Sequence, residues 1–131
     1  MPGLPGAKMG DEVVGVDVHI IMIPTPGGPV PTPLPHPFAG KLVGDLSPNV
    51  MIANMPAATV GSIAVNTPPH IPQGGPFQIP PTNQGTVMTG SLTVMINNKP
   101  AARTGDTVMT CNDPVPAPTS AIVAVSTVLI G

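Results

Sequence analysis

The sequence has almost no aromatic residues: among 131 residues there are two Phe and neither Tyr nor Trp. Side chains that stack on nucleic-acid bases are therefore missing. Charged residues make up only 8% of the chain, with four Lys and Arg against six Asp and Glu. Because nucleic-acid binding depends on a basic surface, this composition argues against a nucleic-acid partner.

Cysteine and long apolar segments are also scarce. The single cysteine, Cys111, has no partner for an internal disulfide, which favours a reducing compartment or a metal ligand over a secreted disulfide framework. The longest apolar segment, 121–130, is interrupted by two hydroxyl residues and is too short to cross a bilayer. The N-terminus lacks the apolar stretch of a signal peptide, so we expect the protein to be made in the cytoplasm.

Proline and glycine are abundant, with 21 and 15 residues, a content near the range of low-complexity disorder. However, 41% of the residues are hydrophobic and the net charge is only −2, whereas disordered chains are poor in apolar residues and highly charged. No stretch of helical length has a convincing 3.6-residue period. We therefore expect a folded all-β protein with long, proline-stiffened connections.

Alternating apolar and β-branched residues predict a strand over 11–23. Shorter strands are expected at 50–53, 62–65, 92–96 and 106–109, and a final strand at 121–130. Segment 24–37 contains seven prolines and is expected to be an extended, polyproline-like excursion. It is either a linker or, as we favour, a loop folded against the body, because His36 and Phe38 lie at its end. Further proline-rich loops are expected at 67–81 and 112–119.

An internal repeat organises the chain. Residues 49–62 (NVMIANMPAATVGS) align with residues 93–106 (TVMINNKPAARTGD), 44 positions further on, and 8 of the 14 aligned pairs are identical. The second half of the same unit recurs at residues 7–13. Because a short repeat usually buries its apolar face by stacking on its siblings, three copies predict a small closed object. The motif residues are Pro56, Ala57, Ala58, Gly61, Pro100, Ala101, Ala102, Arg103 and Gly105.

The tetrapeptide Pro100-Ala101-Ala102-Arg103 resembles the signature of the PAAR-repeat family, and the earlier copy departs from it at Thr59. The resemblance implies a small conical β fold with pseudo-threefold repeats. It also implies a structural, non-enzymatic role as the tip that caps a trimeric, VgrG-like β-helical spike, one tip chain per spike trimer. Such spikes belong to contractile injection systems, namely type VI secretion systems or related phage-tail-like particles, and puncture a target membrane. We expect residues 1–131 to form a single PAAR-like domain without a fused effector domain, exported on contraction, with cargo effectors as further candidate partners.

The resemblance also implies one zinc ion held by histidines and a cysteine. The chain has three histidines and one cysteine in all: His19, His36, His70 and Cys111. Counted from the residue after each repeat glycine, His19 and His70 both follow by 8 positions and Cys111 follows by 5. Three imidazoles and a thiolate form the closed tetrahedral set of structural zinc, although such a set also binds iron. Taken singly, each histidine fits a solvated loop, and the cysteine fits a small buried apolar position.

Two other classes of function are also compatible with the sequence. A zinc hydrolase needs an open metal position and a nearby acid or base, and if His36 were not a ligand, Asp113 would be the candidate base. No HExxH-like pattern supports this reading. The third class is an independently acting secreted effector.

Overall fold

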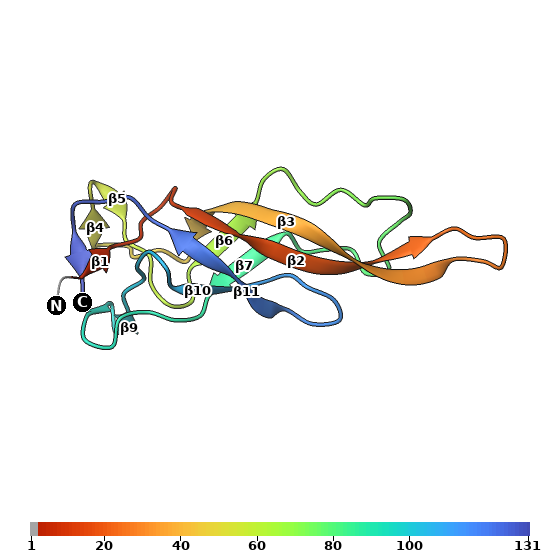
Figure 1. Cartoon of the computed structure of the whole chain (residues 1–131). Helices are drawn as coiled ribbons and strands as arrows, with labels where there is room; N and C mark the ends of the chain where they lie inside the picture. Colours follow the sequence, from red (N-terminus) through yellow and green to blue (C-terminus); the bar gives the residue numbers. More distant parts are fainter. Residues whose placement is uncertain (1–2) are drawn as a thin grey trace.

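The computed structural model describes residues 3–131. The molecule is elongated: both termini lie at its wide end, and a long hairpin projects from the opposite, narrow end (Figure 1). Twelve β-strands and no helix occur in the described part of the chain, which confirms the predicted all-β class. Residues 3–131 accordingly contain no helix that is long and apolar enough to cross a membrane.

The strands fall into two groups, six that build a barrel and six very short ones at the wide end. The barrel strands are β2 (Glu12–Ile23), β3 (Val30–Gly44), β6 (Ile63–Asn66), β7 (Gln84–Val87), β10 (Thr107–Thr110) and β11 (Ala117–Val123). The short strands are β1 (Leu4–Pro5), β4 (Met51–Ile52), β5 (Met55–Pro56), β8 (Met95–Ile96), β9 (Lys99–Pro100) and β12 (Leu129–Ile130).

The barrel is closed and antiparallel, with the strand order β10-β11-β2-β3-β6-β7. It consists of three consecutive hairpins, β2–β3, β6–β7 and β10–β11. The expected strands at 11–23, 62–65 and 106–109 are confirmed as β2, β6 and β10. Strand β7 was not predicted, because Gln84 and Gly85 interrupt the apolar pattern. The single final strand expected at 121–130 is wrong, since β11 ends at Val123 and β12 begins only at Leu129.

The short strands form three equivalent hairpins, β4–β5, β8–β9 and β1–β12. The first two belong to the two full repeats. The third joins the two ends of the chain, and Leu129 pairs with Pro5 as the motif prolines of the full repeats pair with Met51 and Met95. The third repeat is therefore complete but split between the termini, and sequence comparison detected only its N-terminal half.

A ring of three alanines connects the three repeats. The amide of Ala7 donates to the carbonyl of Ala102 (2.9 Å), Ala102 donates to Ala58 (3.0 Å), and Ala58 donates to Ala7 (2.9 Å). All three residues are fully buried. Because each repeat both donates and accepts one bond, the ring closes only when all three copies are present. We call Ala7, Ala58 and Ala102 the alanine ring.

A tight turn follows each residue of the alanine ring and accounts for the glycine of the motif. In the second full copy the backbone amide of Arg103 donates to the carboxylate of Asp106 (2.7 Å), and the amides of Lys8 and Thr59 donate in the same way to the side chains of Asp11 and Ser62. The glycine of each turn has a positive φ, between 85° and 96° for Gly10, Gly61 and Gly105. Only glycine adopts this conformation without strain, which accounts for the repeated glycine.

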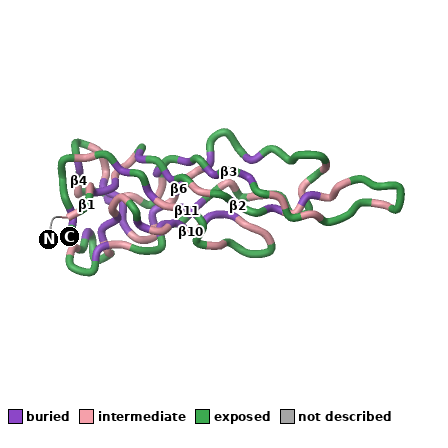
Figure 2. The backbone as a smooth tube through the Cα atoms, in the orientation of Figure 1, coloured by how far each residue is buried: buried purple, intermediate pink, exposed green. Residues whose placement is uncertain are grey.

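Two apolar clusters fill the interior. The wide end is filled by one isoleucine from each short hairpin, Ile52, Ile96 and Ile130, together with motif alanines. The barrel core includes Val13, Phe38, Leu42 and Val108, among other residues. Figure 2 shows that burial is concentrated in the barrel and the wide end, whereas the end of the projecting hairpin is exposed.

The predicted polyproline-like loop at 24–37 is wrong from residue 30 onward, because Val30–Gly44 is strand β3, whose residues 30–41 pair with β2. Its prolines occupy alternate positions, at 31, 33, 35 and 37. Successive residues of a strand present their amides to opposite edges, so prolines spaced by two all fall on one edge and the hydrogen bonds to β2 survive. Alternating proline is therefore compatible with this strand, and the connecting loop shortens to residues 24–29.

The loop expected at 67–81 is confirmed as the long connection between β6 and β7. It folds against the projecting hairpin, since the amide of Met22 donates to Pro76 (2.8 Å) and that of Gln78 donates to Ile20 (2.9 Å). The free edge of β2 is thereby covered near the narrow end.

The alanine ring generates a stability prediction. Replacing Ala102 with Leu places a larger side chain where there is no free volume, so we expect the free energy of unfolding to fall by about 1–3 kcal/mol or more. Urea unfolding of the purified protein measures this change. The matched control is Ala39→Leu, an exposed strand position, for which we expect little change. Equal stability of the two variants would contradict the role given to the ring.

Candidate metal centre

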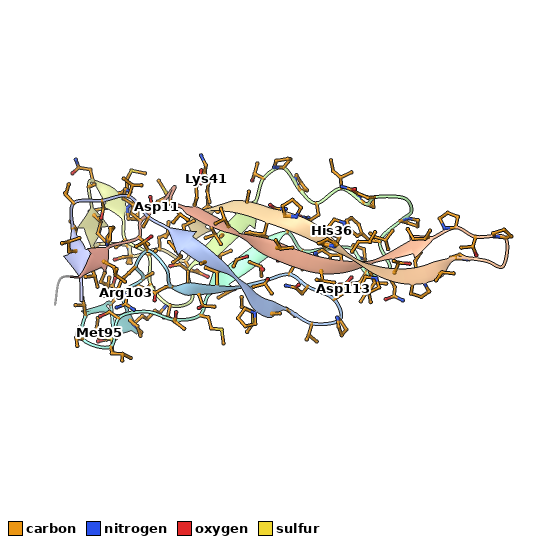
Figure 3. The ribbon with its side chains drawn as sticks, viewed as in Figure 1. Asp11, His36, Lys41, Met95, Arg103 and Asp113 are labelled. Atoms are coloured by element: carbon orange, nitrogen blue, oxygen red, sulfur yellow. The ribbon has the colours of Figure 1, made fainter. Side chains whose placement is uncertain are left out.

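Five buried polar side chains gather inside the barrel where the long hairpin leaves it. Asp17 and His19 lie on β2, and His36 lies on β3, paired in register with Asp17. His70 comes from the long loop after β6, and Cys111 directly follows β10. Every one of the five is at most 9% exposed. Figure 3 shows His36 and Asp113 in this region, and Met95 and Arg103 near the termini.

The position of each side chain follows from strand alternation and from the three hairpins. Asp17, His19 and Ile21 are alternate residues of β2 that are all buried, whereas Val16 and Val18, on either side of Asp17, are exposed. The other two hairpins each bring one side chain from the loop at their narrow end, His70 and Cys111. The cluster is therefore shared by all three hairpins of the barrel.

Four donor atoms, from Asp17, His19, His70 and Cys111, all lie within 4.8 Å of one another. The Cys111 sulfur lies 3.6 Å from His19 Nε2 and 3.4 Å from Asp17 Oδ2. The same carboxylate oxygen lies 2.8 Å from His70 Nε2. Thiolate, imidazole and carboxylate are the ligand types that zinc takes in proteins, so this cluster can hold a metal ion.

His36 lies beside this group but is not among the four residues whose donor atoms are all within 4.8 Å of one another. Its ring centre lies 5.5 Å from the ring centres of both His19 and His70. Nδ1 lies 2.9 Å from the carbonyl oxygen of Leu34, which can only accept, so Nδ1 carries the ring proton. Nε2 is buried and has no hydrogen-bond partner among the described residues. Because a buried polar atom without a partner is costly, its free lone pair fits a metal bond.

The surroundings of His19 also favour metal binding. Its Nδ1 lies 3.5 Å from Asp113 Oδ1, so the carboxylate faces the nitrogen opposite the one near Cys111. Carboxylates behind a histidine ring commonly orient it toward a metal. Burial lowers the pKa of His19, which keeps the ring neutral, and the neutral imidazole is the metal-binding form.

Burial has the opposite effect on Cys111. Desolvation, reinforced by the charge of Asp17, raises the pKa of the thiol to about 11. Without a metal the sulfur is therefore protonated at neutral pH. Since a metal binds the thiolate, metal binding at Cys111 releases this proton.

The four residues singled out in the sequence, His19, His36, His70 and Cys111, thus lie together in space. Asp17 was missed, although its spacing of two from His19 on a predicted strand places both on the same face. The repeat-motif residues lie elsewhere: they build the wide end of the molecule and do not contact the cluster. The fold therefore separates the repeat motif from the candidate metal centre.

Comparison with known proteins gives one family match: residues 77–131 match the family described as PAAR motif. Proteins of this family are spike-tip proteins of type VI secretion that sit on a VgrG spike, bind zinc, and are structural and generally non-enzymatic. The all-β barrel is consistent with the PAAR fold. The chain has no significant match among curated proteins.

Proposed function

We propose that this protein caps the trimeric spike of a contractile injection system, a type VI secretion system or a related particle, as a rigid conical tip for membrane puncture. The observation that carries the proposal is the threefold wide end. Its three short hairpins present equivalent side chains, Met51, Met95 and Leu129, which are 55%, 58% and 57% exposed. Three nearly identical apolar contacts from one chain suit a platform made of three identical chains.

The chemistry of the wide end supports this docking mode. The positions paired with the exposed side chains are prolines in all three hairpins, Pro5, Pro56 and Pro100. Leu4 is also exposed there, at 43%. An apolar, weakly charged patch of this kind is typical of the centre of a stable protein interface. The projecting hairpin at the opposite end then points away from the spike.

We further propose that one structural zinc ion is held by His19, His36, His70 and Cys111. Four protein ligands leave no open position, so the metal would supply a cross-link and no reactive water. The narrow end contains few apolar core residues, and the four ligands come from all three barrel hairpins. Zinc binding contributes on the order of 10 kcal/mol in small metal-dependent folds, enough to hold the three hairpins together under load.

The alternatives have less support. For a zinc hydrolase, Asp113 was the candidate base, but its Oδ2 accepts the amide proton of Ile20 (2.8 Å) and its Oδ1 faces His19. It therefore serves as a structural partner of a ligand. Cargo carriage and independent action as a secreted effector are compatible with the fold, but no feature of the described residues favours them.

The metal proposal predicts that Cys111→Ser and His70→Ala each lower both the zinc content and the melting temperature of the purified protein. Removal of one ligand from a structural site weakens metal binding, and the cross-link is lost with the metal. Zinc is measured by inductively coupled plasma mass spectrometry, and melting by calorimetry. Full metal occupancy in both variants would show that the ligand set is wrong.

The docking proposal predicts that Met95→Glu weakens binding to the trimeric spike by about tenfold or more, equivalent to roughly 1.4 kcal/mol. A carboxylate at the centre of an apolar contact has to be desolvated without a partner. Biolayer interferometry on immobilised spike measures the affinity. Val16→Glu, at a position 51% exposed on the outer face of β2, is the control and keeps wild-type affinity. Equal loss in both variants would place the interface elsewhere.

A further inference from the structure

In the described part of the chain, the narrow half of the molecule presents no Asp, Glu, Lys or Arg side chain to solvent. Asp17 and Asp113 are buried in the candidate metal centre, with side chains 0% and 5% exposed. The other charged residues lie in the short hairpins, in the turns after the alanine ring, or at the adjoining ends of β2 and β3; Figure 3 shows Asp11 and Lys41 on this side. Three segments contain no charged residue at all: 18–40, 46–98 and 114–131.

The outer edge of β2 has a partner for each outward N–H group from residue 18 to the end of the strand. Alternate residues of β2 face β3 and pair with it, and the remaining three amides point away from β3. These three donate to the loops of the other two hairpins: Val18 to Asn112 (2.7 Å), Ile20 to Asp113 (2.8 Å) and Met22 to Pro76 (2.8 Å).

The outer edge of β3 lacks N–H groups for a different reason. The prolines at 31, 33, 35 and 37 occupy the positions that point away from β2, and proline has no N–H. The next outward amide, that of Ala39, donates to the side chain of Asn66 (2.9 Å). The proline carbonyls still face outward, but buried carbonyls without a partner are commoner in proteins than buried N–H groups without one. Neither edge of the hairpin therefore offers a free strand N–H over residues 18–39.

The way in which this edge is protected points to its surroundings. Both a charged side chain and a proline prevent a further strand from adding to an exposed edge. In hydrocarbon the two differ, because a charge is costly there, whereas proline removes a donor that lipid has no means of pairing. The projecting hairpin contains proline at four alternate strand positions and no charge.

We propose that the end of this hairpin, residues 20–33, enters the hydrocarbon core of the target bilayer ahead of the metal centre. This inference rests on the proposed role in membrane puncture and names the part of the chain that meets the lipid. Beyond His19, β2 continues for four residues, about 13 Å at the usual rise per residue. This length is roughly half the thickness of a bilayer's hydrocarbon core, so the hairpin reaches about the middle of the membrane.

Exposed aliphatic side chains supply apolar surface for this contact. Each of the three barrel hairpins contributes at least one from its narrow-end segment: Val30 is 47% exposed, Ile71 68%, Ile79 46% and Val115 65%. Val30 is on the projecting hairpin itself. Ile71 and Ile79 line hollows beside His36 and His19, so apolar surface continues from the hairpin to the level of the metal centre.

The test uses an introduced tryptophan, which reports only its own surroundings because the chain has neither Trp nor Tyr. Val30→Trp places the reporter beside the turn. Val43→Trp, at a position 53% exposed near the other end of β3, is the matched control. We expect phosphatidylcholine vesicles to shift the emission of Val30→Trp to the blue and brominated acyl chains to quench it, with little change in the control. Adding Pro26→Lys to Val30→Trp should lower partitioning about tenfold or more, since lysine is costly in hydrocarbon.

An unquenched Val30→Trp, or equal quenching at both positions, would overturn the proposal. Combining Pro33→Ala and Pro35→Ala with Val30→Trp restores two outward N–H groups, and we expect weaker partitioning of a protein that stays monomeric in light scattering. Unchanged partitioning together with dimers would mean that the prolines only block strand addition, which contradicts the role given to them.

Spike affinity of Val30→Trp separates this inference from the proposed function. Loss of vesicle entry with intact spike binding would refute the inference alone. Vesicle entry without spike binding would refute the cap and support the lipid contact of the hairpin.

Discussion

The structure depends on the ring of backbone hydrogen bonds among Ala7, Ala58 and Ala102. Each bond joins two repeats that are distant in sequence, and the three bonds close a circle that no single repeat forms alone. Close approach of three backbones at one axis leaves no volume for a side chain larger than a methyl group. The motif of proline, alanines and a glycine turn is therefore the sequence requirement of a threefold junction, and the three barrel hairpins all start from it.

The two ends of the molecule are stabilised in different ways. At the wide end the alanine ring is supported by a threefold isoleucine cluster, so hydrogen bonds and apolar burial are sufficient to hold the three repeats together. Toward the narrow end the same three hairpins converge on polar residues, and a core of apolar side chains gives way to the cluster of histidines, Asp17 and Cys111. A metal there would replace the hydrophobic contacts that a narrowing structure has no room to make. With apolar packing at one end and a bound metal at the other, the molecule would be rigid along its whole length.

Much of the fold could be predicted from the sequence, because each full copy of the repeat is one continuous stretch of recognisably similar residues. The two full copies, the all-β class and strand β2 follow from residue identity and spacing. The split third repeat was only half visible, because its strands pair across the chain termini, and a linear alignment does not join them. Strand β3 was misassigned because alternating proline was taken as incompatible with a ladder, whereas a strand paired on one edge tolerates it.

In the candidate metal centre, too, some residues could be predicted from the sequence and others could not. The histidines and the cysteine stood out because the chain contains so few of them. Asp17 did not, since an acidic residue on an exposed-looking strand is ordinary until the fold shows that its side chain is buried among three hydroxyl and amide donors. Pairing across the barrel, which brings Thr110 and Thr119 to Asp17, is a property of tertiary structure that no local pattern reports.

On the proposed function, one threefold-closed chain seats on three identical spike chains and carries one metal ion. Native mass spectrometry of the protein co-expressed with the spike protein of its own genome measures both properties in one experiment. We expect a complex of three spike chains, one copy of this chain and one zinc ion. A zinc-loaded monomer that does not associate with the spike would contradict it and would shift the function toward an independent effector or an enzyme.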